Sequence, residues 1–322
     1  MIGIVVRSIA SLLYATAAVA QTTDSIVRQA RDLFETGSSP AAVTMLRPLA
    51  DSSPAAATLL GRIAWQAGNY KEAARWLDVA IARDPQRVDA YVWRALTYVQ
   101  EIETVSFIRK GSVAGRARSM LDKAVSIDPT NFAAREARTE YYMNAPGIAG
   151  GGMDKARAEA ATAKRASPYR GALLVGRVEE RAGNVAAAEA EYVALMASYP
   201  DSGGGREALT SLYQNRARWD DAFRIIDDRL RTHPADYGML YQLGRAAALS
   251  GQRLEAGEAA LRRYLTRDRA KKAFDGAVHF RLGAILERRS DVAGARSEYE
   301  QAVALDPRNN AAKRALQGVR SP

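Results

Sequence analysis

The apolar positions of this chain recur with a period of about 34 residues, and each period contains two segments with helical spacing. The first segment of several periods opens with a large apolar residue followed by glycine, at Leu60-Gly61, Val175-Gly176, Leu243-Gly244 and Leu282-Gly283. An alanine starts the second segment, at Ala73, Ala117, Ala156, Ala188, Ala222, Ala256 and Ala295. A large apolar residue usually follows four positions later, at Leu77, Leu121, Tyr192, Ile226 and Tyr299. This spacing places both residues on one helix face, so the pattern predicts pairs of helices that pack closely through small side chains.

Prolines separate the periods from one another. They are Pro54, Pro85, Pro129, Pro168, Pro200, Pro234 and Pro307. Proline ends the preceding helix but suits the first turn of the next one. A repeat of this length indicates stacked helical hairpins rather than a single globular core.

The leucine-glycine pair, the alanine four residues before a large apolar residue and the closing proline together resemble the tetratricopeptide repeat. The resemblance covers nearly all of residues 21–322. It implies an all-α fold, a right-handed superhelical solenoid of about eight helical hairpins plus a C-terminal capping helix. The expected units are residues 23–53, 54–87, 88–131, 132–168, 169–202, 203–236, 237–275 and 276–309, with the cap at residues 310–322.

The sequence departs from the repeat pattern at two insertions. The first, around Glu101 to Gly115, is expected to lengthen both helices of the third unit. The second lies within residues 146–152 and contains Gly150, Gly151 and Gly152. A flexible connector is favoured there over an anion-binding loop, because the lysine and hydroxyl residue of a P-loop do not follow. A partner contact is a third interpretation, since insertions in repeat arrays often carry function.

Residues 1–20 differ from the rest of the chain. Arg7 precedes a short apolar stretch that ends in Ala18-Val19-Ala20, and this order is typical of a secretory signal peptide cleaved after Ala20. An uncleaved membrane anchor is the alternative interpretation. We therefore expect a periplasmic or secreted protein whose mature part is residues 21–322. That part contains no stretch of 18 uninterrupted apolar residues, so we expect no transmembrane segment in it.

Charge and cysteine content narrow the possible partners. The chain has 46 lysine and arginine residues against 36 acidic ones, a net charge of +10, and no cysteine. Disulfides, thiolate metal sites and a cysteine nucleophile are thereby excluded. Basic residues cluster at Arg109, Lys110, Arg116 and Arg118, and again at Arg262, Arg263, Arg267, Arg269, Lys271 and Lys272. Such a surface attracts acidic proteins, anionic polymers or lipid headgroups. The export signal and the missing aromatic-and-basic stacking motif argue against nucleic acid.

The residues that usually carry catalysis are sparse. His233 and His279 lie in different units without metal-ligand spacing, so structural roles are favoured. Three carboxylate pairs, Glu179-Glu180, Asp220-Asp221 and Asp227-Asp228, lie beside arginines and predict ion pairs on solvated helices. We therefore expect no catalytic residue, no cofactor, no metal and no small-molecule substrate.

The resemblance also implies a partner-binding surface. In the family, the first helix of each repeat lines the concave face, and its outward positions correspond here to Arg62, Trp65, Gln66, Gln100, Glu140, Asn144, Arg170, Arg177, Arg181, Gln214, Asn215, Tyr241, Arg245, Phe280 and Arg288. Arginines suit a carboxylate or a phosphate through two-pronged hydrogen bonds, and the aromatic residues suit apolar side chains of a peptide. The alternative is that Trp65 packs within its hairpin and the arginines pair with neighbouring acids.

The sequence thus predicts a non-catalytic scaffold or adaptor of the bacterial periplasm or cell envelope, which binds an acidic protein segment. A charge-driven binder of an anionic envelope polymer or nucleic acid is the first alternative, and it predicts binding that weakens steeply with salt. An enzyme with its site in the two insertions is a second, less favoured alternative.

Overall fold

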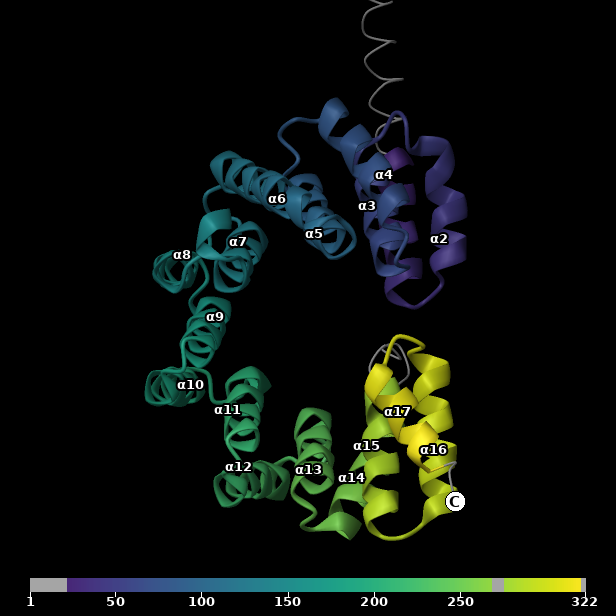
Figure 1. Cartoon of the computed structure of the whole chain (residues 1–322), viewed down its shortest axis with the longest axis vertical. Helices are drawn as coiled ribbons and strands as arrows, with labels where there is room; N and C mark the ends of the chain where they lie inside the picture. Colours follow the sequence, from purple (N-terminus) through teal and green to yellow (C-terminus); the bar gives the residue numbers. More distant parts are fainter. Residues whose placement is uncertain (1–21, 268–274, 320–322) are drawn as a thin grey trace, which may run out of the picture. The chain divides into compact units, whose positions relative to one another are not determined.

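A computed structural model describes residues 22–267 and 275–319, and every regular element in these ranges is a helix (Figure 1). The predicted all-α fold is confirmed. The expected signal peptide lies outside the described residues, as do Arg269, Lys271 and Lys272 of the second basic cluster. Within the described ranges, no helix has the length and apolar character needed to cross a membrane.

The helices follow one another as pairs joined by short turns. A helix over residues 22–35 precedes α2 (Ser39–Leu46) and the short η1 (Arg47–Leu49). The elements that follow are α3 (Pro54–Gln66), α4 (Tyr70–Arg83), α5 (Val88–Thr104), α6 (Phe107–Ile127), α7 (Phe132–Asn144), η2 (Gly147–Ala149), α8 (Met153–Ala166), α9 (Pro168–Arg181), α10 (Val185–Ser198), α11 (Gly203–Asn215), α12 (Trp219–Thr232), α13 (Tyr237–Ser250), α14 (Leu254–Leu265), α15 (Asp275–Arg288), α16 (Val292–Leu305) and α17 (Asn310–Gly318). These residues pack as two compact units, the first ending at Leu174 and the second beginning at Val175, inside α9.

Each repeat glycine lies where two helices of a hairpin cross closely. The pairs are Gly61 with Leu77, Gly176 with Tyr192, Gly244 with Leu261 and Gly283 with Tyr299. A Cβ atom on any of these glycines would lie between 2.1 and 2.6 Å from its partner's side chain, so a larger residue would force the helices apart. In α14 the predicted small packing residue was wrong by one position: Ala256 is exposed, and Gly257 is buried instead.

Where the large residue is tyrosine, its hydroxyl group has a dedicated acceptor. The Tyr192 hydroxyl donates to Glu180 at 2.7 Å, and the Tyr299 hydroxyl donates to Glu287 at 2.6 Å. In both hairpins the glutamate follows the crossing glycine by four positions and therefore lies on the same face of the first helix. The buried rings thus keep their polar ends satisfied.

The turn within several hairpins uses the same local hydrogen bonds. In the α3–α4 turn, Gly68 has φ of +79°, its N–H donates to the Trp65 carbonyl, and the next N–H, of Asn69, donates to the Ala64 carbonyl. Corresponding left-handed positions are Gly37, Gly183, Ala217 and Ser290. Glycine favours this conformation because it has no Cβ, whereas the alanine and serine adopt it at a cost. Each turn is therefore closed by groups within its own hairpin.

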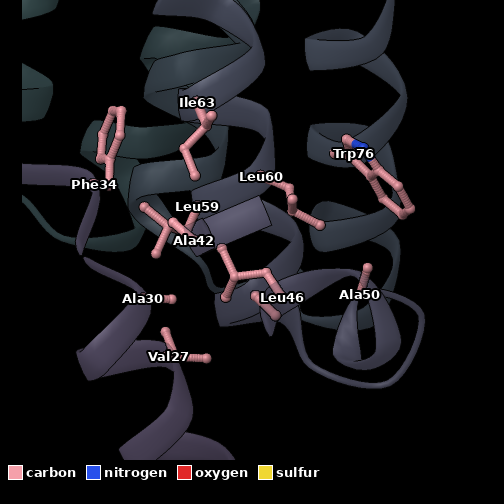
Figure 2. Close-up of a cluster of buried hydrophobic side chains, with 11 residues drawn as sticks. Val27, Ala30, Phe34, Ala42, Leu46, Ala50, Leu59, Leu60, Ile63 and Trp76 are labelled. Atoms are coloured by element: carbon pink, nitrogen blue, oxygen red, sulfur yellow. The ribbon is translucent and has the colours of Figure 1, made fainter. Parts of the chain in front are cut away.

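The beginning of the chain has its own apolar core. Val27, Ala30 and Phe34 from the helix over residues 22–35 pack against Leu46 of α2 and Leu59 of α3 (Figure 2). This packing shows that the shortened first hairpin stacks on the next repeat as the other hairpins do.

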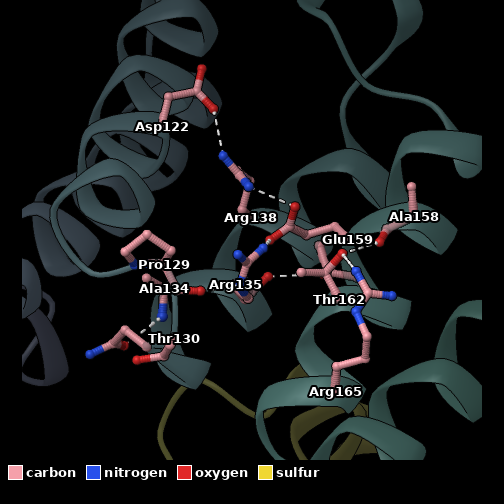
Figure 3. A network of polar contacts seen from close by, with 12 residues as sticks. Asp122, Pro129, Thr130, Ala134, Arg135, Arg138, Ala158, Glu159, Thr162 and Arg165 are labelled. Carbon is pink, nitrogen blue, oxygen red and sulfur yellow. Dashed lines mark hydrogen bonds and ion pairs between the residues drawn. The ribbon is translucent and has the colours of Figure 1, made fainter.

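A buried charged network joins α6, α7 and α8 (Figure 3). Glu159 of α8 accepts from Arg135 at 2.7 Å and from Arg138 at 2.6 Å, and Arg138 also donates to Asp122 of α6 at 3.3 Å. Burial alone would lower the pKa of Arg138, but the hydrogen bond and the charge of Glu159 outweigh it and raise that pKa. Figure 3 shows Glu159 between the two guanidinium groups, which makes it the centre of the network.

The two insertions have defined structures. The first lengthens both helices of its hairpin, as expected: α5 has 17 residues and α6 has 21. The second contains η2, whose Ala149 carbonyl accepts from the Tyr141 hydroxyl at 2.7 Å. The Ala114 carbonyl oxygen lies 3.0 Å from the same hydroxyl oxygen, so the second insertion lies against α6. A Cβ atom on Gly151 would lie 1.8 Å from the Ala145 carbonyl oxygen, so the turn requires glycine there.

Candidate partner-binding surface

The histidines and carboxylates that sequence analysis considered for catalysis make local contacts. His279 of α15 lies 2.6 Å from Glu298 of α16, and His233 caps the end of α12 beside Thr232. In residues 22–267 and 275–319, no group of three or more histidine and acidic side chains could hold a metal ion.

The carboxylate pairs have partners of several kinds. Asp221 pairs with Arg224 and Asp228 with Arg231, as the spacing predicted. Asp227 instead accepts two hydrogen bonds of 2.9 Å from Arg253, the residue that precedes α14.

Among the predicted site residues of the first unit, Arg62 and Trp65 form an aromatic cluster. The Arg62 guanidinium lies 5.1 Å from the Phe34 ring centre and 5.7 Å from that of Trp93. Trp65 meets Trp93 edge to face at 5.4 Å and Tyr70 at 6.1 Å. The Arg62 Nε and the Trp65 Nε1 are buried without a hydrogen-bond partner. Trp65 therefore packs against Tyr70 of its own hairpin, as in the alternative interpretation, and also against Trp93 of the next hairpin.

The other predicted residues of the first unit are dispersed. Gln66 and Asn144 are exposed near the ends of α3 and α7, and Gln100 and Glu140 are half-buried. Arg170 of α9 pairs with Glu136 at 3.5 Å and stacks over Phe132 at 4.0 Å. This arginine thus has the neighbouring acidic partner that the alternative interpretation predicted.

Arg177 and Arg181 are exposed on α9 in the second unit. They line an open pocket with Glu180, Tyr192, Ala208 and Ser211. Tyr192, which also packs against Gly176 at the hairpin crossing, is part of its lining.

Five further predicted residues come from three successive first helices of the second unit. Gln214 and Asn215 end α11, Tyr241 and Arg245 lie one turn apart on α13, and Phe280 lies on α15. Two nitrogens of the Arg245 guanidinium donate to the side-chain oxygens of Gln214 and Asn215, the latter at 2.7 Å. The Gln214 amide in turn donates to the Gln242 carbonyl at 3.0 Å. Neutral groups therefore hold Arg245 in place without neutralising its charge.

A second guanidinium lies near Arg245. Burial first, and the positive charge of Arg281 second, lower the pKa of Arg245. Arg281 stacks on Phe280 at 5.4 Å. Within the described ranges, neither Arg245 nor Arg281 forms an ion pair with a carboxylate. We call Gln214, Asn215, Arg245 and Arg281 the amide–arginine cluster.

Aromatic rings flank this cluster. Tyr241 packs on Tyr264 of α14 with 5.8 Å between ring centres, and Tyr237, one turn earlier, lies 6.4 Å from the same ring. Phe280 packs against Tyr299 at 5.9 Å and is half-buried. Arg288 has a different task, because it donates to the carbonyls of Ala248 and Leu249 and so caps the end of α13.

Sequence reasoning missed Arg281, which lies one position from the predicted Phe280. The sequence carries only a weak signal: no acidic residue lies three or four positions from Arg245 or Arg281, but the same holds for Arg170, which pairs with Glu136. Most other arginines on these helices have such an acid or reach one in a neighbouring helix. The buried Gln242 had no comparable signal, since its role depends on the packing of α11 against α13.

Comparisons with known proteins agree on the type of repeat. A family model described as tetratricopeptide repeat matches residues 27–88 and 252–310. A comparison with curated proteins gives no match. Among solved structures, yeast Tom70 is similar over 93% of this chain and 59% of its own, with 13% identity and a TM-score of 0.69.

Two bacterial structures are also similar. A tetratricopeptide-repeat protein from Parabacteroides merdae matches over 82% of this chain and 98% of its own, with 14% identity and a TM-score of 0.55. A thermophilic protein of the same type from Thermus thermophilus matches over 59% and 98%, with 21% identity and a TM-score of 0.50. At these identities the likeness concerns the fold alone.

Proposed function

We propose that this chain, a tetratricopeptide-repeat protein, is a scaffold whose second unit binds an acidic segment of a partner protein at the amide–arginine cluster. The observation that carries the proposal is the pair Arg245 and Arg281, two close positive charges without a carboxylate partner among the described residues. In this proposal the chain catalyses no reaction.

The geometry of Arg245 favours a carboxylate ligand over a neutral one. Its guanidinium is already oriented by Gln214 and Asn215, so little side-chain entropy is lost when a ligand binds. Burial first, and repulsion from Arg281 second, lower the pKa of Arg245, and a carboxylate would offset that repulsion. Arginine also offers two parallel N–H groups, which match the two oxygens of a carboxylate.

Tyr237 and Tyr241 provide an apolar neighbour to this charged cluster. Both rings lean on Tyr264, which keeps them in place, and Tyr237 remains exposed. Rigid aromatic side chains beside an arginine are typical anchors for a bound peptide. We therefore expect the preferred segment to carry acidic residues next to an apolar one.

Selection from a displayed library of random peptides tests the proposal and does not depend on the identity of the natural partner. The full chain is expected to enrich peptides rich in aspartate and glutamate, and the Arg245→Gln/Arg281→Gln variant is expected to lose this enrichment. Each lost charged hydrogen bond should cost about 1.5–3 kcal/mol of binding free energy. Arg224→Gln/Arg231→Gln is the matched control, because both arginines are exposed and paired on α12.

Equal enrichment by wild type, variant and control would contradict the site assignment. Binding that depends on peptide charge alone and disappears at moderate salt would favour the anionic-polymer alternative, because such binding follows net charge rather than a built site.

We also propose that the chain acts in the periplasm or after secretion, on the basis of the signal-like pattern in residues 1–20. N-terminal sequencing of the protein from the periplasmic fraction of its native host should find Gln21 first. Recovery of the intact N-terminus from the cell interior would contradict export, whereas recovery from membranes would support the uncleaved anchor.

A further inference from the structure

The most exposed apolar side chains of the described residues all come from the two insertions. Phe107 is 89% exposed, Ile108 is 92% exposed and Ile148 is 99% exposed. The next large apolar side chain in this order, Val292, is 55% exposed. Scattered exposed apolar residues are ordinary, but three almost fully exposed ones in two insertions of a regular repeat indicate a contact surface.

The two insertions meet on one face of α6. Phe107 and Ala114 are seven positions apart and therefore lie on the same side of this helix, about 10 Å apart along its axis. The Ala114 carbonyl shares the Tyr141 hydroxyl with the Ala149 carbonyl, next to Ile148. Arg118, one turn further along the same face, lies against Gly150. Ile148 thus lies beside the helix face that carries Phe107.

Basic side chains lie next to these apolar ones. Arg109 and Lys110 directly follow Ile108, and neither forms an ion pair with any residue in the described ranges. Lys155 donates to the Gly150 carbonyl at 3.0 Å, which places its ammonium group beside the second insertion. The acidic side chain nearest to Arg109 in sequence is Glu103, at the end of α5. The surface therefore combines apolar tips with a positive charge.

We propose that Phe107, Ile108 and Ile148, with Arg109, Lys110 and Lys155, form a docking surface for the anionic headgroup region of a phospholipid membrane. The charge of the surface is complementary to anionic lipids. The apolar side chains are almost fully exposed rather than part of a groove, and a Cβ added at the neighbouring Gly111, Gly115 or Gly147 would also meet open space. A bilayer receives projecting side chains without a preformed cavity, whereas a protein partner would need a complementary pocket.

Sedimentation of the full chain with lipid vesicles tests the proposal. Vesicles of phosphatidylcholine with about one third phosphatidylglycerol should bind the chain, and pure phosphatidylcholine should bind it far less. The Phe107→Ser/Ile108→Ser variant is expected to bind at least about tenfold more weakly, because two apolar side chains no longer enter the bilayer. Arg109→Gln/Lys110→Gln should weaken binding to the anionic vesicles by about 25-fold. Val193→Ser/Val292→Ser removes two exposed apolar residues of the second unit and should change nothing.

A fluorescent label gives a second readout. The chain contains no cysteine, so Ile108→Cys, Ile148→Cys and the control Val292→Cys each carry one labelling site. An environment-sensitive dye at the first two positions should shift to the blue on anionic vesicles, and the dye at the control should not.

Three results would overturn the proposal. The first is vesicle binding that is unchanged in the Phe107→Ser/Ile108→Ser variant, which would assign it to residues elsewhere, such as 1–20. The second is the absence of any blue shift at positions 108 and 148. The third is a wild-type dimer, seen by analytical ultracentrifugation, that the variant abolishes while vesicles bind neither form. Because these side chains bury nothing, the variant should keep the circular dichroism and unfolding midpoint of the wild type.

Discussion

Removal of the Glu159 carboxylate should destabilise the first unit more than any other single loss of charge. The side chains of Glu159, Arg135 and Arg138 are 9%, 10% and 17% exposed, and the two contacts measure 2.7 and 2.6 Å. Glu159→Ala would leave two guanidinium groups buried with fewer partners. Breaking a buried ion pair costs about 3–5 kcal/mol. Arg138 keeps Asp122 and Arg135 keeps the Pro129 carbonyl, so we expect the lower end, about 3 kcal/mol.

The assay combines urea unfolding with native-state hydrogen exchange, because a repeat array with two compact units need not unfold in one step. Exchange of amides in α7 and α8 should accelerate, and exchange in α13 and α14 should stay unchanged. Asp228→Ala is the control, since its pair with Arg231 is largely exposed and should contribute at most about 0.5 kcal/mol. A loss below about 1 kcal/mol for Glu159→Ala, or one equal to the control, would refute the argument that buried charge dominates here.

Four other substitutions test separate parts of the structure. Gly283→Ala should lower the free energy of unfolding by about 1–3 kcal/mol, because the added Cβ would lie 2.5 Å from the Tyr299 ring. Gly111→Ala, whose added Cβ meets open space, should raise the free energy of unfolding by about 0.5–1 kcal/mol. Thermal unfolding of the two glycine variants and the wild type measures both changes. Burial, together with the hydrogen bond to Glu189, raises the pKa of Tyr213 to about 12. The stabilisation of the folded state that comes from this raised pKa is complete below the ordinary tyrosine pKa and is lost as the pH rises toward 12. Tyr213→Phe removes the titrating group, so the urea midpoint of the variant should fall less steeply at alkaline pH. Arg288→Met should lower the local stability at the end of α13 by about 1 kcal/mol, because two carbonyls lose their donor. Faster amide hydrogen exchange at the end of this helix would measure the loss.

Sequence analysis predicted the hairpins well because their packing depends on small residues at fixed spacing. Gly61, Gly176, Gly244 and Gly283 mark crossings where no side chain fits, and such positions are visible in the sequence alone. Ala256 shows the limit of this reasoning, since a shift of one residue exchanged a buried position for an exposed one.

The candidate surface was harder to predict because it depends on which helices are neighbours. Arg170 and Arg245 look alike in sequence, yet one pairs with Glu136 and the other is held by amides. Arg288 appeared as a surface residue but caps a helix of the preceding hairpin. The predicted role of these residues in binding stays a prediction that the peptide selection can test.

The self-contained turns have a kinetic consequence. Gly68, Gly183, Ala217 and Ser290 close their hairpins with backbone groups of the same hairpin. The contacts that start folding are therefore close in sequence, and folding limited by local contacts is fast. A chain that emerges from a membrane pore or a ribosome could close one hairpin before the next is available, so that each new hairpin finds a folded neighbour to stack on. Such stepwise folding would spare the chain a long unfolded intermediate with exposed apolar faces.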